Sequence, residues 1–161
     1  MPEQPSSDID QLVQNNLSED GTLDLETRNI GDPGIQALAQ MDVLAKVKRL
    51  ELGENEISNE GVAALCQSPH IGNLRVLNLK SNNITDPGAQ VLAETGNLPQ
   101  LEQLILKFNR IGEAGAIFIA ESKTLGGLTT LDLFRNRIGD AGAKAIKRSP
   151  NFPRLNRMRL D

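Results

Sequence analysis

The most reactive side chains of this 161-residue chain belong to its one cysteine, Cys66, and its one histidine, His70. A cysteine beside a histidine could be a nucleophile with its general base, and both could bind a metal ion. A zinc site needs three or four ligands, however, and the sequence has no second Cys/His cluster. Phosphate-binding loops, recognisable catalytic motifs and paired-carboxylate signatures are also missing. The sequence therefore predicts no catalytic site, no metal site and no cofactor.

Four asparagines recur every 27 residues, and their amide groups could bind either a ligand or the protein backbone. They are Asn55, Asn82, Asn109 and Asn136. Each follows the second leucine of an L-x-L motif by three residues, where a strand would end and the chain would turn. Each amide offers two donors and an acceptor, which suits the backbone groups that a turn exposes. We predict a buried asparagine ladder with a structural role, in preference to a catalytic one.

The elements around the asparagines repeat with the same period. An isoleucine stands two residues after each asparagine, and a glycine four residues later opens a helical stretch such as residues 112–121. A strand, a crossover helix and a parallel strand form a right-handed unit, and repeating this unit produces a solenoid. The strand cores are Leu23–Leu25, Leu50–Leu52, Leu77–Leu79, Leu104–Leu106, Leu131–Leu133 and Met158–Leu160.

Several side chains receive expected positions from this alignment of repeats. Phe118 and Ile119 are expected to point inward from their helix, and Cys66 aligns mostly with alanines and should be buried. His70 aligns with polar residues and should lie in an exposed loop. Asp32 and Asp86, each followed by a proline, should cap their own helices.

The pattern L-x-x-L-x-L-x-x-N-x-I followed by a helix resembles the ribonuclease-inhibitor-like leucine-rich repeats. The resemblance covers residues 23–160. It implies an α/β fold, a right-handed leucine-rich-repeat solenoid with parallel strands on the concave face and helices on the convex face. The short, uniform, Gly/Ala-rich repeats look similar to bacterial proteins of this class. The resemblance also implies that another protein binds on the concave face, without identifying it.

The chain is expected to have two parts. Residues 1–19 are predicted to be an N-terminal tail and capping helix, with apolar residues of the segment 7–13 covering the first strand. Residues 20–161 are predicted to be the solenoid, with about five repeats and a final strand. Arg157 and Arg159 would block the open edge of that strand, so we expect a monomer, with a weak edge-strand dimer as the alternative.

Charge is distributed unevenly along the chain. Residues 1–80 contain six Lys/Arg and thirteen Asp/Glu, whereas residues 81–161 contain eleven and eight. This asymmetry could orient a charged partner, although surface charge that serves solubility alone is the alternative. The net charge of −4 argues against a dedicated nucleic-acid binder, which is usually basic. The sequence shows no signal peptide and no apolar stretch of membrane-spanning length. We therefore expect a cytoplasmic protein without membrane contact, with a secreted bacterial effector as the alternative.

The outward positions of the strands contain the strongest indication of function. Neighbouring strands lie about 4.8 Å apart, which would bring Ile105, Phe108 and Phe134 into one patch. Exposed aromatic residues surrounded by arginine are typical of binding hot spots, although surface apolar residues of no consequence are the alternative. The predicted protein-binding residues are Lys80, Ile105, Lys107, Phe108, Arg110, Asp132, Phe134, Arg135 and Arg137.

These observations predict a non-enzymatic module that binds another protein on its concave face. An extended or acidic segment would suit the predicted patch. One alternative is a regulator of a partner enzyme, similar to the GTPase activators built from leucine-rich repeats. Another is the repeat fragment of a bacterial effector whose other regions carry the function.

Overall fold

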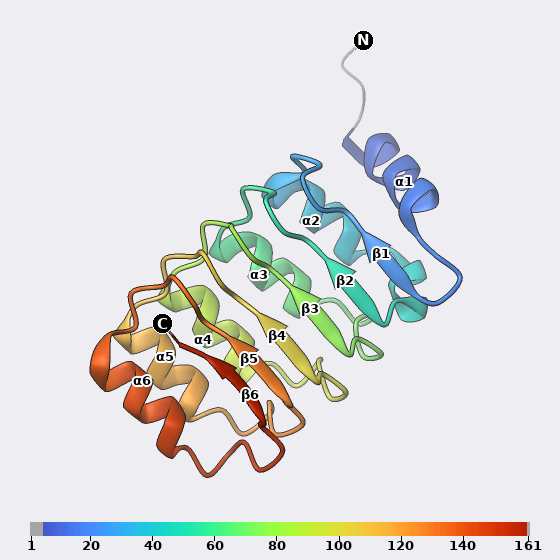
Figure 1. Ribbon diagram of the computed structural model, residues 1–161. Helices are drawn as coiled ribbons and strands as arrows, with labels where there is room; N and C mark the ends of the chain where they lie inside the picture. The colour runs from blue at the N-terminus through green and yellow to red at the C-terminus, as the bar shows by residue number, and fades with distance from the viewer. Residues whose placement is uncertain (1–4, 161) are drawn as a thin grey trace.

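The protein is a six-stranded parallel sheet with helices along one side, in a computed structural model that describes residues 5–160 (Figure 1). The strands follow one another in sequence order. They are β1 (Thr22–Asp24), β2 (Arg49–Glu51), β3 (Val76–Asn78), β4 (Gln103–Ile105), β5 (Thr130–Asp132) and β6 (Arg157–Arg159). The helices are α1 (Pro5–Asn16), α2 (Gly31–Ala39), α3 (Asn59–Cys66), α4 (Asp86–Glu94), α5 (Glu113–Ala120) and α6 (Gly139–Arg148), with a 3₁₀ helix η1 (Asp42–Lys46). The predicted α/β solenoid is confirmed.

The strands pair in the register that the repeat predicts. Leu50 pairs with Leu77, which pairs with Leu104, so equivalent residues of successive repeats face each other. Each of the strands β1 to β5 begins one residue before the first leucine of its L-x-L motif and ends before the second. Both leucines are nevertheless buried, because their side chains point to the same face of the sheet, two residues apart.

The core between sheet and helices is aliphatic, and one prediction about it needs correction. Ile119 is fully buried, but Phe118, which was also expected to point inward, is only half-buried. Successive helix residues are rotated by about 100°, so two neighbours cannot both face the sheet. The equivalent pair Val91 and Leu92 behaves in the same way, with Leu92 fully buried.

The asparagines join each repeat to the one before it. The amide nitrogen of Asn109 donates to the carbonyl oxygens of Leu79 (2.9 Å) and Leu106 (3.0 Å), and its side-chain oxygen accepts from the Ile84 N–H (3.0 Å). Asn82 and Asn55 make the same kinds of bond one and two repeats earlier. All three are buried, whereas Asn136 is half-buried. These contacts support a structural role.

A second column of polar side chains lies at the helix starts. Asp32 and Asp86 were expected to cap their own helices, but each binds the start of the next repeat's helical segment instead. The Asp86 carboxylate accepts from the Gly112 N–H (2.6 Å), and Asp32 accepts from the Gly61 N–H (3.1 Å). Asn59 likewise accepts from backbone N–H groups of the following repeat. An aspartate in the first turn points away from its own orphan N–H groups, toward the neighbouring helix stacked beside it.

A third column satisfies the opposite ends of the helices. The Ser68 hydroxyl donates to the carbonyl oxygen of Ala39 (2.7 Å), one repeat earlier. The Ser122 hydroxyl donates to that of Ala93 in the same way (2.6 Å). The last carbonyl groups of a helix have no partner within the helix, so these hydroxyls satisfy otherwise unpaired acceptors.

Helix α1 lies against the first repeat, at the N-terminal end of the solenoid (Figure 1). Its Ile9 and Val13 are buried and pack in the common core. Residues 1–4 of the predicted capping segment lie outside the described residues, so the boundary between residues 1–19 and 20–161 stays a proposal. Within residues 5–160, no helix is both long and apolar enough to cross a membrane.

We predict that Asn109→Leu destabilises the protein. The substitution leaves the Ile84 N–H and the Leu79 and Leu106 carbonyl groups without their buried partner, at a cost of about 1–3 kcal/mol. Because repeats couple to their neighbours, chemical denaturation should show an earlier or broader transition. A variant that unfolds like the wild type but has lost binding would contradict the structural role.

The contact between Asn59 and the next helix predicts a second stability effect. A Cβ atom at Gly88 would lie 2.5 Å from Asn59 Oδ1 and 2.8 Å from the Ile84 side chain. Gly88→Ala should therefore reduce the free energy of unfolding by about 1–3 kcal/mol. Gly72→Ala is the matched control, because nothing lies within 4 Å of its added Cβ. Equal stabilities of the two variants would show that the helix layers are not closely packed at Gly88.

Candidate protein-binding surface

Two phenylalanines from neighbouring repeats form the centre of the candidate surface. The ring centroids of Phe108 and Phe134 lie 5.9 Å apart at an interplanar angle of 83°, an edge-to-face contact. Phe108 is 48% exposed, and Phe134 is half-buried beneath its neighbours. An edge-to-face pair holds both rings in a defined orientation, so the exposed ring is already positioned for contact.

Two arginines stack on the more buried ring. The guanidinium carbon of Arg135 lies 5.2 Å from the Phe134 centroid, and that of Arg159 lies 4.7 Å from it. Arg159 also approaches the Asp132 carboxylate at 3.8 Å. The sequence had assigned Arg159 only to blocking the edge of the last strand. Its register opposite Asp132 was the available signal for a role at this surface.

The remaining predicted residues are placed differently from one another. Ile105 and Lys107 are half-buried on and just after β4, and Arg110 and Arg137 are exposed in the turns beyond the strands. Asp132 is buried, and its carboxylate accepts from the backbone N–H of Phe134 (3.0 Å). Asp132 therefore orients the turn that carries Phe134.

Lys80, which was also predicted to belong to the patch, points toward the acidic end. Its ammonium group forms an ion pair with Glu26, two strands away. Gly53 lies between them, and a Cβ there would come within 2.8 Å of the Lys80 side chain. The hydrogen bond from Lys80 to Glu26, with further attraction from Glu54 and Glu51, raises the pKa of Lys80. Lys80 is thus already ion-paired, whereas the exposed cations of the turns near Phe108 form no ion pair among the described residues.

The backbone at Phe108 adopts an unusual conformation. Its φ is 58°, and the equivalent residues Glu54, Ser81 and Arg135 have φ values of 56°, 54° and 59°. For residues other than glycine this left-handed region costs about 1–2 kcal/mol. The sequence contains no glycine at these positions, so no local signal revealed the conformation. The equivalent residues share it, so this conformation is a property of the repeat, and it fixes the direction in which the Phe108 ring projects.

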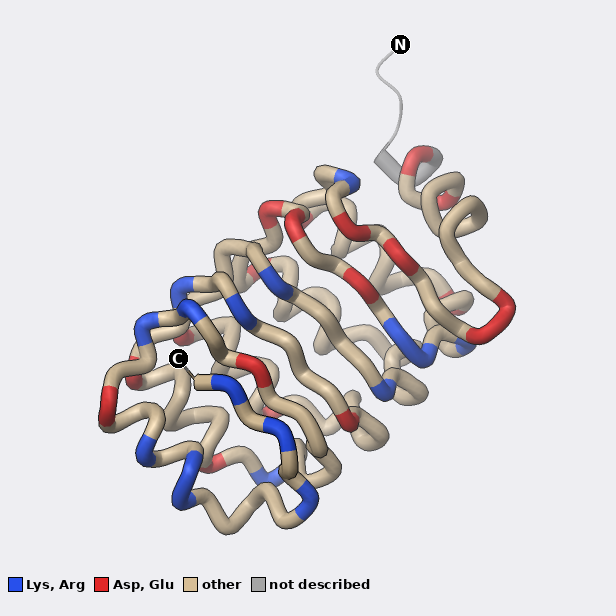
Figure 2. Tube along the Cα trace, viewed as in Figure 1, with Lys and Arg blue, Asp and Glu red and all other residues tan. Residues whose placement is uncertain are grey.

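Charge is segregated across the sheet. Figure 2 shows acidic positions gathered on and around β1 and β2, and basic positions gathered toward β6. On the acidic side, Glu51 pairs with Arg49 at 2.9 Å and also accepts from the Asn78 amide. The sequence predicted this asymmetry along the chain, and the parallel stack of repeats converts it into an asymmetry in space.

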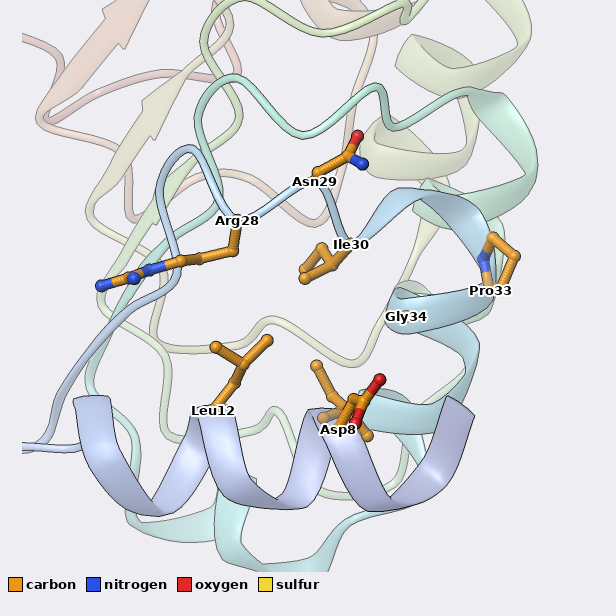
Figure 3. Close-up of a pocket in the computed structure, with 8 residues that line it drawn as sticks. Asp8, Leu12, Arg28, Asn29, Ile30, Pro33 and Gly34 are labelled. Carbon is orange, nitrogen blue, oxygen red and sulfur yellow. The ribbon is translucent and has the colours of Figure 1, made fainter. Parts of the chain in front are cut away.

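A shallow hollow lies at the other end of the molecule, between α1 and the turn before α2 (Figure 3). It measures about 240 Å³, and its lining includes Leu12, Ile30 and Pro33. Asp8 and Arg28 stand at its polar margin (Figure 3), and Arg28 donates to the Asn16 amide oxygen at 3.1 Å. Its small size and its contact with the capping helix are consistent with imperfect packing between α1 and the first repeat.

No hydrogen bond joins the side chains of Cys66 and His70 among the described residues. Cys66 is 4% exposed, as its alignment with alanines predicts, and burial raises the pKa of its thiol to about 12. His70 is half-buried, which corrects its predicted exposure, because the turn that follows α3 folds back onto Ser68. Among the described residues, no group of three His, Cys, Asp or Glu side chains could hold a metal ion.

Comparison with known proteins identifies the family. A family model described as "Leucine Rich repeat" matches residues 43–66, 73–93, 97–120 and 128–147, more than half of the chain. The chain therefore belongs to the leucine-rich-repeat family, whose members generally act as protein-binding scaffolds and are typically non-catalytic. The strand–helix repeats are of the ribonuclease-inhibitor-like kind that the sequence predicted.

Solved structures similar to the chain include an internalin from Listeria monocytogenes. It shares 25% sequence identity with the chain and superimposes with a TM-score of 0.48. The match covers 76% of this chain and 36% of the internalin chain. No curated protein sequence matches the chain.

We predict that native Cys66 reacts slowly with thiol reagents. The thiolate is the reactive form, and a pKa raised to about 12 makes it scarce at neutral pH. Labelling should accelerate strongly in urea, which unfolds the protein and exposes the thiol with an ordinary pKa of about 8.5. A native labelling rate as fast as the rate in urea, measured by mass spectrometry, would contradict the burial of Cys66.

Proposed function

We propose that this chain is a non-enzymatic module that binds another protein through an aromatic–basic cluster on its concave face. The cluster consists of Ile105, Lys107, Phe108, Asp132, Phe134, Arg135 and Arg159, with Arg110 and Arg137 at its margin and Lys80 on its acidic side. The observation that supports the proposal best is the exposed Phe108 ring, which is held in a strained backbone conformation and packed against the Arg-stacked Phe134.

The physical argument rests on preorganisation. Binding costs the free energy of immobilising flexible side chains, about 0.5–1.5 kcal/mol for each. Phe134 is fixed by two guanidinium groups and by its edge-to-face contact with Phe108, so little of this cost remains. Covering Phe108 would also remove apolar surface from water, and the surrounding cations would attract an acidic segment.

The other parts of the proposal rest on composition. The acidic net charge favours a protein partner over nucleic acid, and the single, free cysteine suits a cytoplasmic location. A monomer is proposed, because Arg157 and Arg159 on β6 would repel the same residues of a second copy paired edge to edge. Sedimentation of the purified protein would test the last point directly.

We predict that Phe108→Ala/Phe134→Ala loses its partner. The partner would first be captured with the wild-type protein and identified, and its affinity for both proteins would then be measured by calorimetry. Removal of two anchor residues should weaken binding at least about 30-fold, which corresponds to about 2 kcal/mol. Loss of the edge-to-face contact should lower the free energy of unfolding by only about 1 kcal/mol, so the fold should persist.

The matched control is Glu94→Ala/Lys123→Ala. Both residues are exposed, and they lie at the end of α4 and just after α5, in the helical layer. This variant should bind like the wild type. If the control loses the partner while the phenylalanine variant retains it, the binding site lies on the convex face and the proposal fails.

A further inference from the structure

Two rows of side chains cross the repeats along the edge of the concave face, in the turns that follow the strands. The first rim row consists of Glu54, Ser81, Phe108 and Arg135, and the second rim row consists of Glu56, Asn83, Arg110 and Arg137. All residues of the first rim row share the left-handed backbone conformation. Equivalent residues with the same backbone conformation project their side chains in the same direction.

Backbone hydrogen bonds continue the ladder of the sheet into both rows. The Glu54 N–H donates to the Lys80 carbonyl oxygen (3.1 Å), and the Phe108 N–H donates to that of Phe134 (2.9 Å). In the second rim row, the Arg110 N–H donates to the Ile84 carbonyl oxygen (2.9 Å). These bonds hold neighbouring members of a row at the spacing of parallel strands, about 4.8 Å.

The chemical character of the rows changes in order along the solenoid. Glu54 and Glu56 are acidic and exposed, and the next repeat contributes only neutral polar side chains. Phe108 then supplies an exposed aromatic ring, and Arg135 and Arg137 supply exposed cations. Both rows therefore run from acidic to basic in the same direction, with the aromatic ring nearer the basic end.

The side-chain charges of the two rim rows make no direct ion pairs among the described residues. Along residues 5–160, the four ion pairs use the acids Glu26, Glu51, Glu102 and Asp132, and none includes a member of either rim row. Lys80 attracts Glu54 at longer range, but the acids and cations of the rims are exposed and form no direct ion pair among the described residues. Unpaired charges of both signs in fixed order favour a partner with the complementary order.

We propose that the partner segment lies across the strands along the rim rows, with a basic side chain over Glu54 and Glu56, an apolar side chain against Phe108, and an acidic side chain over Arg135 and Arg137. This inference deepens the proposed function and rests on it. It differs from a purely acidic partner because it assigns a cation to the segment as well.

The spacing translates into a sequence pattern. Glu54 and Phe108 are two repeats apart, about 10 Å, which three residues of a polyproline II segment span at about 3.1 Å each, with the first and fourth side chains on the same side. Phe108 and Arg135 are one repeat apart, about 5 Å, or one to two residues. The expected segment therefore reads basic-x-x-apolar-acidic, with zero or one residue between the last two. Side chains alone provide the recognition, so the reversed order along the backbone is equally acceptable.

Selection from a random linear peptide library displayed on phage tests this pattern. The full chain would be immobilised as wild type, as Glu54→Lys/Glu56→Lys and as Phe108→Ala/Phe134→Ala. Peptides enriched on the wild type should carry the pattern, and the charge-reversed protein should lose the preference for the basic residue but keep that for the apolar one. The phenylalanine variant should enrich none of these peptides.

The outcomes separate the two proposals. Peptides that depend on the phenylalanines but contain only acidic residues, or charges in no consistent order, would overturn the inference and leave the proposed function intact. Enriched peptides that bind the Phe108→Ala/Phe134→Ala protein as well as they bind the wild type would overturn both proposals. No enrichment above uncoated surface would also count against both.

A synthetic peptide with the enriched sequence supplies the quantitative test. Replacing its basic residue by Gln should weaken binding to the wild type about threefold, the scale of an exposed ion pair. On Glu54→Gln/Glu56→Gln the same replacement should have no effect. An equal loss on both proteins, measured by fluorescence anisotropy, would show that the basic residue does not contact the rim acids.

Discussion

The hydrogen bonds that cross from each repeat to its neighbour are the interactions on which the rest of this structure depends. A single repeat with a three-residue strand and a helix of eight to ten residues could not bury its apolar side or pair its polar backbone alone. Asparagine amides satisfy the turns, acidic or amide side chains satisfy the helix starts, and serine or threonine hydroxyls satisfy the helix ends. In each column the hydrogen-bond partner lies about 27 residues away, so every repeat satisfies backbone groups of its neighbour.

This dependence has a consequence for the surface. Because the asparagine ladder and the strand ladder fix the turns from both sides, the residues just after each strand keep one backbone conformation whatever their side chains. Glutamate, serine, phenylalanine and arginine all occupy the left-handed position. The repeat thereby separates folding from recognition. The buried columns of polar side chains stabilise the fold, and the residue type at the rim positions can vary. A strained Phe108 is tolerated because its neighbours determine its conformation.

The candidate surface was predictable in part. Exposed phenylalanines one repeat apart, flanked by arginine, follow from the strand register alone, and Phe108 and Phe134 do meet. The strand register does not determine which residues the flexible charged side chains contact. Lys80 reaches across Gly53 to Glu26, and Arg159 folds over Phe134, because each finds its strongest attraction in a neighbouring repeat. Long side chains have many rotamers, and only the assembled neighbours select one.

The sequence by itself determined the period, the strand cores, the inward leucines and the position of the asparagines, because these depend on spacings that recur every 27 residues and on alternation along a strand. It could not determine which repeat each polar group serves. Asp86 looks like the cap of its own helix, yet it binds Gly112 of the next repeat. Only the tertiary structure decided such pairings, because the distance between stacked helices, and not the local sequence, sets which backbone N–H group lies within reach of a short carboxylate.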